Sequence, residues 1–248
     1  MATSGITTYA LTRDQIIQFA LRKIGALALG ATPDSTEVTN AAQALDMMIK
    51  SWVTKGIKLW TINEITIPLV ASQTSYILGP TGATPTPDVE TDKPMKLMQA
   101  WLRNTSVTPN NDIPLQVLSQ QEYNQFGSKF STGVSNATYL QVGRDTSTLY
   151  TYLTPDTNAA SMYQMHIVTQ RLIQDAGIST ANLDFPGEWL YALGWNLAAE
   201  LSIDYGVDQQ RLQYIEAKAG KFLTEVEDFD TEYNSVFFSP SLPQRQQR

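Results

Sequence analysis

The chain has 248 residues, no cysteine, one histidine and a formal charge of −7, from 24 acidic and 17 basic side chains. Without cysteine there are no disulfides, thiol nucleophiles or zinc–thiolate sites, and one histidine cannot make a histidine-rich metal site. We therefore expect no metal and no cofactor. The acidic balance is the opposite of the basic surface that grips nucleic acid. We also expect no membrane contact, because no apolar run is long enough to span a bilayer and the first residues lack the features of a secretory signal.

Residues 1–58 are predicted to form a helical hairpin. Thr12 and Gln15 make a capping box for the first helix, and Gly25 is placed to end it. The second helix begins near Asp34 and ends at Gly56. Apolar residues recur at helical spacing in both. They are Ile16, Ile17, Ala20, Leu21 and Ile24 in the first helix, and Val38, Ala41, Ala42, Leu45, Met48, Ile49 and Trp52 in the second.

Residues 59–175 are predicted to form an antiparallel β-domain with long loops, because the apolar period changes to two. A strand over residues 63–69 turns over 72–74 and returns over 76–78, which predicts a hairpin. Residues 139–142 and 149–153 flank a polar turn, and residues 162–170 alternate again. Prolines in residues 79–94 indicate an exposed loop, and residues 119–126 indicate one or two helical turns.

Residues 176–232 are predicted to form helices that pack on the N-terminal pair. Asp184 is the expected cap of the first, with Pro186 in its first turn. Apolar residues, Ile203 among them, cover most of that helix, which predicts burial on several sides. Asp208 caps the last helix, whose apolar residues follow the spacing of a seam against one neighbour. Our candidates for contacts between subunits are Leu212, Ile215, Phe222, Val226 and Phe229.

The end of the last helix is acidic, and the segment after it is apolar and then polar. Acidic runs are usually solvated faces or charged rims. The acidic candidates are Glu225, Glu227, Asp228, Asp230 and Glu232. Residues 233–248 are predicted to be an extended tail, because Pro240 and Pro243 prevent a helix. An apolar cluster is unusual in a disordered tail, so this segment either docks on a partner or has no role. The docking candidates are Val236, Phe237, Phe238, Leu242, Arg245 and Arg248.

No catalytic residue is expected, since the chain has no phosphate-binding loop and no nucleophile motif. His166 shares a mostly polar strand face with Gln164 and Gln170, which predicts a surface or interface histidine rather than a general base. The five tryptophans stand in apolar surroundings and are expected in cores. Glu188 and Glu200 leave open a pair of carboxylates for glycoside hydrolysis, so a peptidoglycan hydrolase is the alternative function.

Five stretches follow one another at characteristic spacing along the chain. They are residues 17–25 (IQFALRKIG), 44–52 (ALDMMIKSW), 93–94 (KP) with 100–103 (AWLR), 113–115 (IPL), and 185–193 (FPGEWLYAL). In the order and spacing of these stretches, rather than in one motif, the chain from Leu11 to about Tyr233 resembles the head-to-tail adaptor family of short-tailed phages, the tail accessory factors that stabilise packaged DNA.

The resemblance implies a structural virion protein of α+β fold, a helical bundle with an inserted antiparallel β-domain, and no enzyme. It implies a ring of about twelve copies attached to the portal at the head–tail junction, assembled in the host cytoplasm. The ring would extend the DNA channel, help to retain packaged DNA, and carry the tail nozzle or tail tube protein. DNA would pass without sequence-specific binding, because an acidic wall repels phosphate. If the protein is such an adaptor, we expect the docking candidates in residues 233–248 to contact the portal. The hydrolase, carried in the virion, and a DNA-binding module remain the alternatives.

Overall fold

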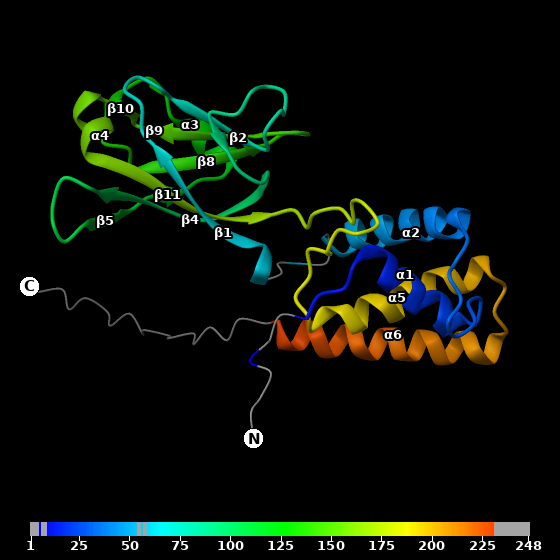
Figure 1. The fold of residues 1–248 in the computed structure, drawn as a ribbon. Helices are drawn as coiled ribbons and strands as arrows, with labels where there is room; N and C mark the ends of the chain where they lie inside the picture. The colour runs from blue at the N-terminus through cyan, green and yellow to red at the C-terminus, as the bar shows by residue number, and fades with distance from the viewer. Residues whose placement is uncertain (1–4, 6–8, 54–55, 57–58, 231–248) are drawn as a thin grey trace, which may run out of the picture.

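The computed structural model of the protein describes residues 5, 9–53, 56 and 59–230, which form a helical domain and a β-sandwich (Figure 1). The α+β fold class is confirmed. Helices from both ends of the chain form a bundle, and the β-domain is inserted between them in the sequence. The four helices of the bundle are α1 (Arg13–Ile24), α2 (Ser35–Val53), α5 (Trp189–Asp204) and α6 (Gln209–Phe229).

Helix α1 begins and ends where the sequence predicts, and α2 begins directly after Asp34 as predicted. The described part of α2 ends at Val53, before the predicted stop at Gly56. The Thr12 and Gln15 side chains each accept from the other's backbone N–H, which completes the capping box of α1. Gly25 ends α1 with φ of +83°, a left-handed conformation that favours glycine. Nearly all the apolar positions predicted for α1 and α2 are buried, and only Val38 is partly exposed.

Helix α5 lies among α1, α2 and α6, and its buried residues occupy most of its circumference. Two predictions about α5 are wrong. It begins at Trp189 rather than after Asp184, whose carboxylate instead binds Arg171. Ile203 is 73% exposed rather than buried, because it lies at an open groove between α2 and α5 that no other described element fills. Asp208 caps α6 as predicted, by accepting from the backbone N–H groups of Gln210 and Arg211.

The β-domain contains two larger sheets and one short pair of strands. The four-stranded antiparallel sheet has the order β1 (Ile62–Pro68), β11 (Tyr163–Arg171), β4 (Pro94–Asn104) and β5 (Asn111–Pro114). The five-stranded sheet has the order β3 (Val89–Glu90), β2 (Ser75–Gly79), β9 (Ser147–Tyr152), β8 (Ala137–Val142) and β6 (Gln116–Val117). The remaining elements are the pair β7 (Thr132–Gly133) and β10 (Thr154–Pro155), the short helices α3 (Gln120–Gln125) and α4 (Thr157–Met162), and the 3₁₀ turn η1 (Leu59–Thr61).

The predicted hairpin of β1 and β2 does not form. Strand β1 pairs with β11 and strand β2 pairs with β9, so the turn at Ser72 carries the chain from one sheet to the other. This crossing lets both strands bury their inner residues against each other: Ile65 and Ile67 from β1, Tyr76 and Leu78 from β2. The hairpin of β8 and β9 forms as predicted.

The β-domain is mixed rather than purely antiparallel. The short strands β3, β6 and β7 each pair in parallel with a neighbour. The longest strand, β4, was not predicted from the alternation of residues, because its burial pattern breaks at bulges opposite β11. The short helix predicted within residues 119–126 is α3, which is capped by Ser119 and Glu122.

Polar contacts join the two domains at the end of β11. Arg171 donates two hydrogen bonds to Asp184, at 2.5 and 2.9 Å, and Trp60 Nε1 donates to the Asp184 carbonyl at 3.2 Å. Beyond that link, the Asp46 carboxylate of α2 accepts from the Ala176 backbone N–H at 3.0 Å. Among the described helices, none combines the length and apolar character needed to cross a bilayer.

Candidate interaction surfaces

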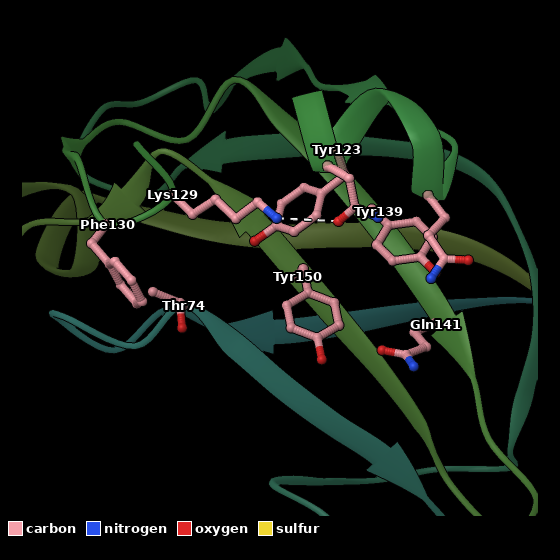
Figure 2. Close-up of a pocket in the computed structure, with 9 residues that line it drawn as sticks. Thr74, Tyr123, Lys129, Phe130, Tyr139, Gln141 and Tyr150 are labelled. Atoms are coloured by element: carbon pink, nitrogen blue, oxygen red, sulfur yellow. Dashed lines mark hydrogen bonds between the residues drawn. The ribbon is translucent and has the colours of Figure 1, made fainter. Parts of the chain in front are cut away.

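A pocket lined by tyrosines lies on the outer face of the five-stranded sheet, where α3 covers it (Figure 2). Tyr139 from β8 and Tyr150 from β9 point outward because the alternate residues of these strands face the sandwich core. Tyr123 from α3 lies over them, with its ring centroid 5.6 Å from that of Tyr139 and 5.5 Å from that of Tyr150. The cavity has a volume of about 290 Å³.

The lining of this tyrosine pocket is suited to binding a flat, partly apolar group. Besides the rings, its lining offers amides and a hydroxyl, together with Lys129, which lies 5.0 Å from the Tyr123 ring centroid and donates to Asn124 at 3.1 Å. None of the residues that line it is a carboxylate or a histidine. The pocket can stack a flat apolar group between its rings and hydrogen-bond the edge of that group.

These tyrosines should make the protein less stable at alkaline pH. Burial raises the pKa of Tyr123 and Tyr139, and the neighbouring Tyr150 raises both further. A tyrosine whose folded pKa lies above its unfolded value of 10.0 adds stability that is present below that value. This stability is lost as the pH rises towards the folded pKa. We expect the free energy of unfolding in urea to fall above about pH 10. Tyr139→Phe should make this decrease of the free energy of unfolding with pH shallower. An unchanged decrease would contradict the contribution of Tyr139.

His166 is buried, so the prediction of a surface histidine is wrong. It shares its strand face with polar residues as predicted, but its side chain is only 8% exposed. Its ring stacks on Trp101 with centroids 5.5 Å apart, and Nδ1 lies 2.7 Å from Glu64 Oε1 and 3.2 Å from Thr66 Oγ1. The sequence gives no sign of this partner, because Glu64 is 102 residues away and reaches His166 only through the pairing of β1 with β11.

Glu188 and Glu200 do not form a pair of carboxylates. Both are exposed, and they are twelve positions apart along α5, which is about 18 Å of helix. Carboxylates that hydrolyse glycosides are within about 10 Å of each other. Among the described residues, no group of three or more acids and histidines is placed to hold a metal ion.

The candidate residues of α6 divide between the core and the surface. Ile215 is 1% exposed and packs on the core of its own chain, which leaves it no surface for another subunit. Phe222 and Val226 are partly buried against that core, Leu212 is half-buried, and Phe229 is 75% exposed.

The acidic candidates do not form one surface. At about 100° per residue, Glu225 and Asp228 lie on one side of α6, and Glu227 and Asp230 lie on the other. Glu225 also pairs with Lys221 at 3.5 Å. Glu232 and all six docking candidates of the tail lie outside the described residues.

The helical domain has an exposed surface of aromatic and basic residues, which we call the aromatic–basic face. It is formed where α1, α5 and α6 meet. Tyr191 is 48% and Tyr214 is 57% exposed, whereas Trp195 lies buried beneath them. The residues of the aromatic–basic face are Phe19, Lys23, Tyr191, Trp195, Tyr214, Lys218 and Phe222.

A groove with an acidic rim lies between α2 and α5, and we call it the acid-rimmed groove. Its volume is about 360 Å³. Met47 from α2 is 69% exposed and Ile203 from α5 is 73% exposed, although both are large and apolar. Glu200 and Asp204 from α5 supply the acidic rim. The sequence offered one sign of this groove: Met47 lies outside the apolar stripe of α2.

A comparison with protein families gives a match that covers nearly the whole chain. Residues 11–240 match the family model described as SU10 adaptor protein. No curated protein matches the chain significantly. The matched region includes both the helical bundle and the β-sandwich, so the comparison applies to the whole fold.

Proposed function

This chain belongs to the SU10 adaptor protein family, a family of phage head-to-tail adaptors, and from that premise we propose that it forms a ring on the portal. The protein is a structural adaptor of a phage particle. In our proposal about twelve copies extend the DNA channel below the portal at the head–tail junction. The ring assembles in the host cytoplasm, helps to retain packaged DNA, and carries the tail nozzle or tail tube protein.

The observation that carries this proposal is the extent of the family match, from residue 11 to residue 240. The surfaces of the helical domain support it, because a chain that exposes large apolar side chains on two faces is suited to neighbours. On α6, Leu212, Phe222, Val226 and Phe229 keep exposed area that a neighbouring subunit can cover.

The charge of the protein supports passage of DNA rather than binding. A formal charge of −7 supplies no net attraction for phosphate. A channel wall of this charge would let packaged DNA slide, because no attraction to phosphate would hold it.

We assign portal docking to the tail. Val236, Phe237 and Phe238 are three consecutive apolar residues, and Arg245 and Arg248 add positive charge near the end of the chain. Apolar anchors with flanking charge are typical of short docking segments. Acidic residues on the portal would then form ion pairs with the two arginines.

Removing residues 234–248 tests both the ring and the docking segment. We expect the full-length protein mixed with portal to give rings on portal in negative-stain images. The truncated protein should keep its unfolding temperature, because residues 9–230 contain the hydrophobic cores of both domains, and it should lose portal binding.

A matched control separates apolar anchoring from the mere presence of the tail. The triple change Val236→Ser, Phe237→Ser and Phe238→Ser should also abolish portal binding, whereas Ser239→Ala with Ser241→Ala should not. Full-length protein that never associates with portal would overturn the proposed function. Truncated protein that still binds would overturn only the role of the tail.

A further inference from the structure

The two exposed faces of the helical domain are complementary in charge and in apolar character. We propose that the aromatic–basic face of one copy docks into the acid-rimmed groove of the next copy around the ring. This inference rests on the proposed function and names the contact between subunits that the ring requires.

The lysines of the aromatic–basic face are held in place by rings rather than by acids. Lys23 Nζ lies 4.8 Å from the Phe19 ring centroid and 5.3 Å from that of Trp195. Lys218 Nζ lies 5.6 Å from Tyr214 and 5.7 Å from Phe222. Within the described chain, no carboxylate lies within salt-bridge distance of either lysine. Both charges are therefore open to an acidic partner that also covers the aromatic surface.

The acid-rimmed groove has the matching features. Met47 and Ile203 offer apolar surface at its mouth, and a methionine side chain adapts its shape to the group that fills the groove. Glu200 and Asp204 stand beside them on α5 and can meet the two lysines. A tyrosine such as Tyr214 suits such a groove, because its ring is apolar and its hydroxyl can reach the polar rim.

The positions of the two faces favour a ring over a twofold dimer. Tyr191 and Glu200 are nine positions apart on α5, so they point about 180° away from each other around the helix. If each face met its own copy, lysines would oppose lysines and acids would oppose acids. Only contact between the face and the groove joins opposite charges. A contact between two different surfaces continues from copy to copy and closes into a ring when the rotation allows.

The absence of native cysteine makes cross-linking a direct test. Two single variants, Ile203→Cys in the groove and Tyr214→Cys on the face, are assembled on portal separately and as a mixture. They are then treated with a short bismaleimide. We expect covalent dimers in the mixture and almost none with either variant alone. A mixture of Ile203→Cys with Val142→Cys, an exposed site in the β-domain, is the matched control.

A charge exchange tests the same contact without a cross-linker. Lys218→Glu alone and Glu200→Lys alone should each lower the yield of rings on portal by about tenfold. The two changes in one chain restore the ion pair and should restore most of the yield. If the cysteine variants assemble into rings but their mixture gives no covalent dimers, or if either variant alone gives as many, the inference is overturned and the proposed function stands. Wild-type protein that forms no ring would overturn the proposed function itself.

Discussion

Replacing Trp189 with alanine should destabilise the helical domain by about 3–5 kcal/mol, the largest effect that we expect from a single substitution. Trp189 is 2% exposed and stands among the rings of Trp52, Trp60 and Phe185, with centroids 5.9, 4.8 and 6.3 Å away. These rings come from three parts of the chain, so no one helix can move to fill the cavity. The substitution therefore loses both the burial and the ring contacts.

The measurement is urea unfolding followed by circular dichroism at 222 nm, which reports mainly on the helices. The thermal midpoint should fall by about 2–4 °C for each kcal/mol, given the length of the chain. Trp189→Phe is the matched control and should cost markedly less, because it keeps a ring in the same site. A loss below about 1 kcal/mol for the alanine variant would contradict the burial of this side chain.

Replacing Asp184 with alanine should have the second largest effect, about 2–4 kcal/mol. The Arg171 side chain is 14% exposed and the Asp184 side chain 20% exposed, and two hydrogen bonds join them. Asp184 Oδ2 also accepts from the Gln174 backbone N–H at 3.0 Å. Removing the carboxylate leaves a mostly buried guanidinium with the more distant Asp92, at 3.6 Å, and one hydrogen bond to the Leu172 carbonyl. The effect is large because an unpaired buried charge costs more than the lost contact.

The Arg103–Asp112 pair is the matched control, because it is also joined by two hydrogen bonds but lies at the surface. Its side chains are 33% and 43% exposed, so Asp112→Ala should change the free energy of unfolding far less than Asp184→Ala. The double variant Arg171→Met with Asp184→Leu should recover much of the lost stability, since it buries no charge. If the two aspartate variants were equally destabilised, the burial of Arg171 would not be the cause.

Some of the proposed sites were within reach of sequence reasoning, and others were not. The apolar stripe of α6 was predictable from its spacing, but its surroundings were not, because Ile215 faces the core and Phe229 faces solvent. The acidic run looked like one surface, whereas the rotation of the helix alone divides it between two sides. The tyrosine pocket and the acid-rimmed groove each need residues from separate segments, and no spacing along the chain brings those together.

The sequence by itself determined the local elements of this protein. The capping box at Thr12, the glycine stop at Gly25 and the cap at Asp208 each act within four residues, so their contacts form wherever the rest of the chain lies. Tertiary structure decided the rest: β1 pairs with β11 instead of β2, His166 is buried against Glu64, and Asp184 binds Arg171 instead of capping a helix. Each of these depends on which distant surface buries the most apolar area, a choice made by packing rather than by neighbours in the chain.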